Sequence, residues 1–237
     1  LTLGAYRDKN ENHLMAGSLR EIRIYNHALS LEEIQKNSEL CRVLTDLPPK
    51  LAAPADFLVR PYIQQATQTS IKIMWETRAE ADSRIDFGEA VPLKRRVTSD
   101  EYETMHEVEL TDLKPETNYF YRVRSEDREG RKSISKVFSF QTAVKESSAY
   151  AFGVISDTQS NPRVWGQVAQ GLFGERPNFA VLAGDIVGDG NKKHEWTDDF
   201  FAPGHTLMSR VCVYAILGNH ENDAKNYYDY LAAPDPE

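Results

Sequence analysis

The stretch Phe179-Ala-Val-Leu-Ala-Gly-Asp-Ile-Val-Gly-Asp-Gly190 places a glycine and an aspartate directly after a short apolar run. Residues 150–155 and 211–217 form two further apolar runs of strand length. The segments 163–174, 195–201 and 222–231 are predicted to be helical. Short apolar strands that alternate with helices are typical of a parallel sheet buried on both faces, so we predict an α/β domain over residues 149–237.

Residues with metal-binding chemistry follow each apolar run. They lie in Ser156-Asp-Thr-Gln159, in Gly184-Asp185 and in Gly218-Asn-His-Glu221. Ligands of such sheets gather at the carboxyl ends of the strands. Alternate side chains of an extended segment share a side, so Asp157 and Gln159 can face one ion, and the two oxygens of Asp185 can bridge two cations. Oxygen donors and an imidazole suit Mg, Mn, Zn or Fe.

Residues 56–144 have the pattern of an all-β domain. Residues 70–77 alternate with Ile71, Ile73 and Trp75 on one side, and residues 119–123 and 137–140 continue the series. Leu113-Lys-Pro-Glu-Thr-Asn-Tyr119 has the form of a tyrosine corner, in which the phenol bonds back to the preceding backbone. We therefore predict a small β-sandwich whose tryptophan and tyrosines pack in the core rather than bind sugar.

Residues 1–45 precede this domain, and residues 46–55 form a Pro-rich linker. A half-buried strand is predicted at 18–25, and Ser30-Leu-Glu-Glu33 is a capping box for a short helix. Residues 1–4 and 17–34 resemble the C-terminal end of a laminin-G/concanavalin-like jelly roll, which implies a partial β jelly-roll remnant related to carbohydrate binding or adhesion. The alternative is a strand and a helix that brace the next domain.

The composition restricts the class of partner. The chain has 28 Lys and Arg against 36 Asp and Glu, a formal net charge of −8. This balance argues against nucleic-acid binding, which needs clustered basic residues. No apolar stretch approaches the length of a membrane span, and no signal peptide is visible. Cys41 and Cys212 fall in different predicted domains, and two thiols do not decide the redox compartment.

The order of the three strand-end motifs is more specific than any one of them. It resembles the calcineurin-like metallophosphoesterases, whose αββα-type domain begins with Asp-x-His, continues with Gly-Asp-x-x-Asp or Gly-Asp-x-x-Tyr, and then has Gly-Asn-His-Glu/Asp. The preceding sandwich looks like the fibronectin type III module that precedes purple acid phosphatase catalytic domains. The resemblance implies a multidomain chain: an all-β fibronectin III-like sandwich followed by a truncated α/β metallophosphoesterase domain.

The resemblance also implies two divalent metal ions and a role for each motif residue. Asp157 and Gln159 would hold the first ion, Asp185 would bridge both, and Asn219 would hold the second. His220 would stabilise charge on the transferring phosphoryl group or protonate the leaving oxygen. Paired cations clamp the phosphate, lower the pKa of a bound water and offset the charge of an in-line displacement.

Three positions depart from the family pattern. Gln159 replaces the usual His, and its neutral amide either binds a metal weakly or hydrogen-bonds a metal-bound water. Gly188 stands where purple acid phosphatases have a metal-binding Tyr, so no charge-transfer colour is expected and selection for ferric iron is in doubt. Asp189 lies one residue beyond the usual second acid, which leaves its role open.

The family has two further His-containing motifs downstream, whereas this chain ends at Glu237. His194 and His205 come too early to replace them, so we expect solvent-facing or capping roles for both. We therefore expect an active parent protein, and we expect this fragment alone to be inactive, with under-coordinated ions and exposed apolar surface.

The expected function is metal-dependent hydrolysis of a phosphate monoester or diester by an extracellular, periplasmic or cell-surface protein. The expectation that the protein is exported follows from the other domains that the chain resembles. The alternative is a carbohydrate- or matrix-binding cell-surface protein with a degenerate phosphoesterase domain, which Gln159 and Gly188 favour. The two retained aspartates, with Asn219 and His220, favour catalysis. A nuclease relative conflicts with the acidic charge.

Overall fold

The computed structural model describes Ala5–Arg7, Asn12–Leu14 and residues 57–232. The chain forms two compact units, residues 1–50 and 51–237. In the first unit, β1 (Ala5–Arg7) pairs antiparallel with β2 (Asn12–Leu14). The strand predicted at 18–25, the helix predicted after Ser30 and the linker lie outside the described residues, so the jelly-roll remnant stays a prediction.

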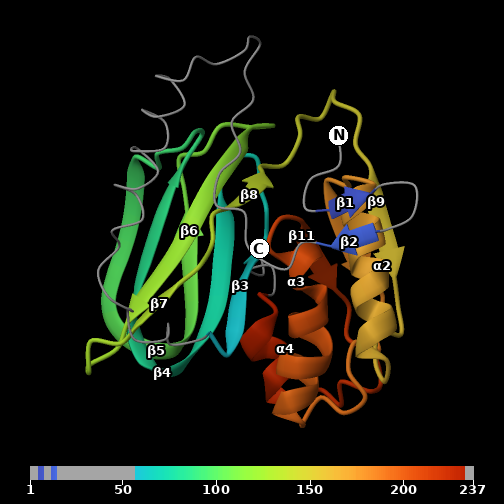
Figure 1. Ribbon diagram of the computed structural model, residues 1–237. Coiled ribbons are helices and arrows are strands. Elements are labelled where there is room, and N and C mark those ends of the chain that lie inside the picture. The colour runs from blue at the N-terminus through green and yellow to red at the C-terminus, as the bar shows by residue number, and fades with distance from the viewer. Residues whose placement is uncertain (1–4, 8–11, 15–56, 233–237) are drawn as a thin grey trace. The chain divides into compact units, whose positions relative to one another are not determined.

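The second unit begins with a β-sandwich, as predicted (Figure 1). Its strands are β3 (Val59–Gln64), β4 (Ile71–Gly88), β5 (Arg95–Leu110), β6 (Asn118–Glu126), β7 (Lys132–Ile134) and β8 (Phe138–Gln141). The long strand β4 organises the fold, because its first half pairs with β3, its second half pairs with β6, and both halves pair with β5. Strands β7 and β8 both pair with β6.

The sandwich core confirms the predicted alternation. Ile71, Ile73 and Trp75 are all fully buried on the same side of β4. The indole Nε1 of Trp75 donates to Ser125 Oγ at 2.9 Å, so the buried ring has its polar atom satisfied. The hydroxyl of Tyr119 accepts a hydrogen bond from the backbone N–H of Lys114 at 3.0 Å, which confirms the tyrosine corner.

An α/β domain follows the sandwich. Its elements are β9 (Phe152–Ile155), α2 (Pro162–Gly174), β10 (Phe179–Leu182), the π-helix η1 (Glu195–Phe201), α3 (Ala202–Met208), β11 (Cys212–Ala215) and α4 (Lys225–Tyr230). The three strands form a parallel sheet in the order β11-β10-β9. Asn161 is the N-cap residue of helix α2, and its Oδ1 accepts a hydrogen bond from Val164 N. Pro162 follows in the first turn of the helix. Among the described residues, no helix is long and apolar enough to cross a membrane.

Within the described residues one face of this sheet is covered by helices and the other only in part, so the prediction of a sheet buried on both faces holds in part. Ala180, Leu182 and Val213 are buried in one cluster with Trp165 of α2, Phe200 of η1 and Leu207 of α3. All three helical segments thus pack on the same face. On the other face Cys212 is buried against the sandwich core, whereas the side chains of Phe152 and Val154 are 52% and 63% exposed.

The sandwich packs directly against the α/β domain. The buried carboxylate of Glu76 accepts from Lys193 Nζ at 2.5 Å and from the hydroxyl of Tyr230 at 2.7 Å. The hydroxyl of Tyr62 donates to the carbonyl of Tyr230 at 2.7 Å, and that of Tyr121 donates to the carbonyl of Ser209 at 2.8 Å. These buried polar contacts fix the orientation of the two domains.

Candidate metal centre

The loops that follow β9, β10 and β11 meet at one edge of the sheet. Leu182 at the end of β10 lies opposite Ile155 of β9 and Ala215 of β11. The backbone N–H of Asp157 donates to Gly184 O at 3.3 Å, which joins the first loop to the second. The structure therefore brings the three predicted motifs together at the carboxyl ends of the strands.

Both predicted carboxylate ligands occupy a left-handed backbone conformation, with φ of 55° at Asp157 and 52° at Asp185. Gly184, with φ of 86°, continues this bend directly before Asp185. Left-handed non-glycine residues are uncommon and concentrate at functional sites, where the surrounding structure holds them. The hydroxyl of Ser156 donates to Asp157 Oδ2 at 2.6 Å and so fixes one of the two carboxylates.

The fully buried carboxylate of Glu221 ties the second loop to the third. Its Oε1 accepts from the backbone N–H groups of Ile186 (2.6 Å) and Val187 (3.2 Å). Its Oε2 accepts from those of Asp185 (3.1 Å) and Gly218 (2.6 Å). Four amide donors compensate the buried charge. Glu221 belongs to the third motif, but the sequence does not indicate its role, because three of its four amide partners come from another loop.

Two glycines allow the loops this close approach. A Cβ at Gly190 would overlap the backbone carbonyl of Glu221, and a Cβ at Gly218 would overlap the backbone N and carboxylate of Asp185. The N–H of Gly190 also donates to His220 O at 3.0 Å. Any side chain at either position would separate the second and third motifs.

His220 lies at the centre of this edge. Its backbone N–H donates to Asp185 Oδ1 at 3.2 Å, and its ring Nδ1 lies 2.9 Å from Gly188 O. Since a carbonyl only accepts, Nδ1 is the donor, and Nε2 is left as the nitrogen that can exchange a proton. The Gly188 carbonyl raises the pKa of His220, and the carboxylates of Asp185, Glu221 and Asp157 raise it further.

Gly188 and Asp189, two of the departures from the family pattern, have structural roles. A Cβ at Gly188 would lie 2.9 Å from Glu195 Oε2, so Glu195 fills the space beside it. Asp189 Oδ1 accepts from Asn191 N at 3.1 Å and from Asn222 Nδ2 at 3.1 Å. The hydrogen bond from the Asn191 backbone leads the effects that lower the pKa of Asp189. Asp189 thus orders its loop.

The two amides are positioned differently. Gln159 Oε1 is buried without a hydrogen-bond partner, which is an environment that a cation or a bound water would satisfy. Asn219 is exposed beside His220. Among the described residues no group of three or more His, Cys, Asp or Glu side chains has an arrangement that could hold a metal ion by itself. The donors are therefore two carboxylates and two amide oxygens, a set that fits part of a site for Mg, Mn, Zn or Fe.

The two earlier histidines lie away from this edge. His194 is exposed and makes no capping hydrogen bond at the start of η1. The expectation of a solvent-facing or capping role is wrong for His205, because its ring packs edge-on against Phe138 at 5.2 Å and its Nε2 is buried. Burial lowers the pKa of His205 to about 3.

Within residues 57–232, the fold defines a β-sandwich and an α/β domain with an oxygen-rich site at the strand ends of the latter. Residues 150–236 match the family of calcineurin-like phosphoesterases, and residues 59–142 match the purple acid phosphatase N-terminal domain. The first match covers the α/β domain, and the second covers the sandwich. The resemblances to these two families are confirmed, whereas neither match extends before residue 59, and the jelly-roll resemblance of residues 1–4 and 17–34 stays a prediction.

Two solved structures share this fold. A purple acid phosphatase isolated from yellow lupin (Lupinus luteus) seeds aligns with a TM-score of 0.56 and 18% identity, over 68% of this chain and 35% of the lupin chain. PhoD aligns with a TM-score of 0.60 and 12% identity, over 80% of this chain and 49% of that one. The chain thus spans about a third to a half of these structures. A comparison with curated proteins finds no match.

Proposed function

We propose that this protein hydrolyses phosphate esters at the edge formed by Asp157, Asp185 and His220. The observation that carries the proposal is the hydrogen bond from His220 N to Asp185 Oδ1, at 3.2 Å. This bond comes from the backbone, and the ring of the same residue lies near enough to Asp185 for that carboxylate to raise its pKa. Both residues belong to a domain that matches the calcineurin-like phosphoesterases. The buried carboxylate of Glu221 supports this arrangement, because it binds the backbone amides of Asp185 in the second loop and of Gly218 in the third.

Asp157, Gln159, Asp185 and Asn219 would hold the two divalent metal ions of the proposed site. When bound, such ions supply Lewis-acid stabilisation of the phosphoryl charge and a more acidic water. Further ligands are needed, because among the described residues no group of three His, Cys, Asp or Glu side chains could hold a metal ion by itself. The unsatisfied Gln159 Oε1 supports a direct or water-mediated role for that residue.

His220 would stabilise charge on the phosphoryl group or transfer a proton to the leaving oxygen. Its Nδ1–H is held by Gly188 O, so the ring has a fixed tautomer and a fixed orientation. The raised pKa of the ring favours the protonated form, which can donate from Nε2. The proposal covers monoesters and diesters alike.

The test is hydrolysis of p-nitrophenyl phosphate and bis(p-nitrophenyl) phosphate by the full-length protein. The protein is treated with a chelator and then supplied with Mn, Zn, Mg or Fe. Metal-restored turnover is expected, and Asp185→Ala is expected to lower it by about a hundredfold or more. Asp100→Ala, at an exposed position on β5, is the matched control and is expected to retain full turnover.

Absence of turnover with every metal, in a protein that is folded, would overturn the proposal. It would then favour the degenerate phosphoesterase with a binding role. Comparable turnover in Asp185→Ala and Asp100→Ala would show instead that the observed hydrolysis does not arise at this edge.

A further inference from the structure

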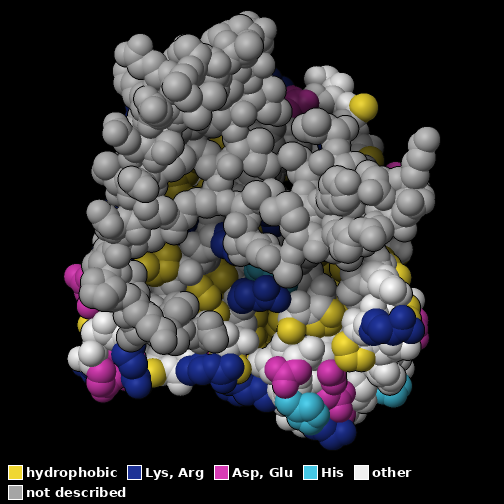
Figure 2. All heavy atoms as spheres, viewed as in Figure 1, with side chains coloured by type: hydrophobic (Ala, Val, Ile, Leu, Met, Phe, Trp, Pro, Cys, Tyr) yellow, Lys and Arg dark blue, Asp and Glu magenta, His cyan; other side chains and the backbone are white. Residues whose placement is uncertain are grey.

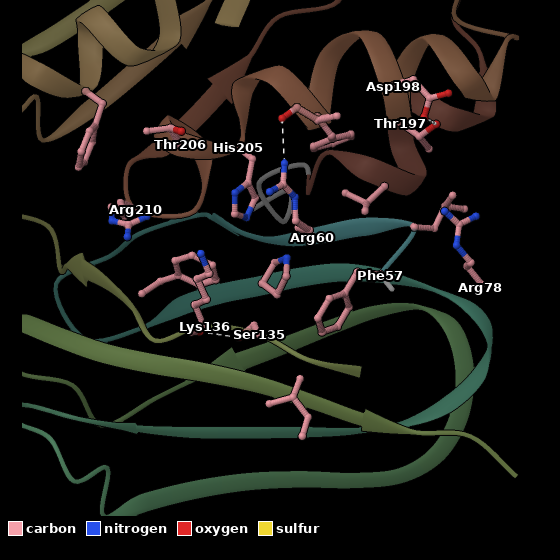
Figure 3. A pocket seen from close by; sticks show the side chains of 18 residues that line it. Phe57, Arg60, Arg78, Ser135, Lys136, Thr197, Asp198, His205, Thr206 and Arg210 are labelled. Atoms are coloured by element: carbon pink, nitrogen blue, oxygen red, sulfur yellow. Dashed lines mark hydrogen bonds between the residues drawn. The ribbon is translucent and has the colours of Figure 1, made fainter. Parts of the chain in front are cut away.

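We propose that a cavity between the sandwich and the helices of the α/β domain binds a small organic molecule that carries two negatively charged groups on an apolar skeleton. The cavity has a volume of about 690 Å³, within the range of small-molecule sites. It is lined by β3, by the segment after β7, and by η1 and α3 (Figure 3). None of its lining residues belongs to the three strand-end motifs.

Four cationic side chains line this cavity: Arg60, Arg78, Lys136 and Arg210. Among the described lining residues, Asp198 is the one carboxylate, and its Oδ1 accepts from Thr197 Oγ1 at 2.9 Å. A concentration of positive charge is unusual in a chain with a net charge of −8. Cationic walls of this kind attract and orient anions.

The four cations have no carboxylate partner within the described part of the chain. Arg60 donates from Nη2 to the carbonyl of Ala202 at 3.0 Å, and Arg210 donates from Nη1 to Ser209 Oγ at 2.9 Å. Both bonds go to neutral oxygens, so the charges stay uncompensated. Several cations elsewhere in the described part of the chain are paired, as Lys193 is with Glu76. Unpaired cations around a cavity are a feature that a bound anion would explain.

Three of these four positive charges lie close enough to the ring of His205 to affect its pKa. Burial is the main cause of its lowered pKa, and the charges of Arg60, Arg210 and Lys136 each lower it further. Figure 3 shows Arg60 and His205 side by side at the middle of the cavity. The buried Nε2 of His205 has no hydrogen-bond partner, so the neutral ring has an unused polar atom there.

The ligand needs an apolar part as well as charge. Phe57, Phe138, Phe173 and Phe201 also line the cavity. The guanidinium of Arg210 already lies over Phe138, 5.0 Å from the ring centroid. Figure 2 shows Lys and Arg side chains among hydrophobic ones near the middle of the face viewed there. Inorganic phosphate alone would make no use of the apolar part of this lining.

The probe is naphthalene-1,5-disulfonate, a rigid aromatic dianion that has no ester bond to hydrolyse. Its binding to the full-length protein is measured by titration calorimetry in a chelator, so that metal at the strand-end edge does not contribute. The cavity variant is Arg78→Gln/Lys136→Gln, and the matched control is Lys94→Gln/Arg163→Gln. All four side chains are exposed, and the two variants change the net charge equally.

We expect one bound dianion per chain, and we expect the cavity variant to raise its Kd by about fivefold or more. The control is expected to stay within about twofold of the parent, and Asp198→Asn is expected to tighten binding because it removes the one negative charge of the lining. No binding by the parent, or equal weakening in the control, would overturn the proposal. Sulfate is expected to bind more weakly than the aromatic dianion, and equal affinity would contradict the apolar part of the site.

Discussion

The carboxylate of Glu221 accepts a hydrogen bond from the backbone N–H of Asp185, which lies on a different loop. Because Glu221 is fully buried and binds three further amides, this contact fixes the position of the central proposed metal ligand. The residue after the catalytic candidate His220 thus supports the residue that would bridge the ions. The geometry of the edge therefore depends on a buried side chain whose carboxylate is bound by four backbone amides.

Replacing Glu221 with Gln should therefore damage both stability and metal binding. The amide keeps one acceptor oxygen, but its NH2 group faces backbone donors that the carboxylate satisfied. We expect a loss of about 2–3 kcal/mol in the free energy of unfolding, measured by urea denaturation. We also expect metal affinity to fall by about tenfold or more. Glu175→Gln, at an exposed position after α2, should change stability by less than about 0.5 kcal/mol. Equal effects of the two substitutions would contradict this role for Glu221.

Adding one methyl group at Gly190 should destabilise the domain, because that group would overlap the carbonyl of Glu221. We expect Gly190→Ala to lower the free energy of unfolding by about 1–3 kcal/mol. Gly171→Ala provides the contrast: it lies within α2 and its Cβ would meet open space, so it should stabilise by about 0.5–1 kcal/mol. Both variants are measured by urea denaturation. If their midpoints shift in the same direction, the close contact with the Glu221 carbonyl is not the reason why residue 190 is a glycine.

The contact between the two domains should be sensitive to one hydroxyl. Tyr230→Phe removes the donor that Glu76 Oε2 binds at 2.7 Å in a buried environment. We expect a loss of about 1–2 kcal/mol in thermal or urea unfolding. Tyr228→Phe, whose ring is exposed, should change stability by less than about 0.5 kcal/mol. An unchanged midpoint for Tyr230→Phe would mean that the lysine alone satisfies Glu76.

The sandwich should lose stability as the pH falls through the weakly acidic range. Burial lowers the pKa of His106 from 6.5 to about 4. Between these values the unfolded chain binds a proton that the folded chain does not, so stability is full above pH 6.5 and decreases toward pH 4, by on the order of 3 kcal/mol. His205 contributes in the same direction. In NMR titrations the ring of His106 should stay neutral at pH 5, and a midpoint near 6.5 would refute the expectation.

Residues 70–77 and the strand-end motifs could be predicted because their signals are local. Ile71, Ile73 and Trp75 alternate, and each polar motif directly follows an apolar run. The same local patterns do not reveal strand β5, whose sequence is strongly charged and whose side chains are mostly exposed. That strand forms because it completes the ladder of β4 along both halves.

The roles of Glu221 and His205 could not be predicted for a different reason. Glu221 acts through amides that the sheet topology brings to it, 34 to 36 residues away for three of the four. His205 lies in a short helix that the sequence analysis missed, and its ring is buried by the packing of α3 beside the sandwich. In both cases the tertiary contacts, rather than the local sequence, determine what the side chain does.

The most direct test of the central claim is the binding of Mn²⁺ to the full-length protein, followed by electron paramagnetic resonance of the free ion. The claim predicts saturable binding that Asp157→Asn and Asp185→Asn each weaken by about tenfold or more, whereas Asp100→Asn leaves it unchanged. Saturable binding that neither site variant alters would contradict the claim, because the ion would then be held by residues other than those at the strand ends.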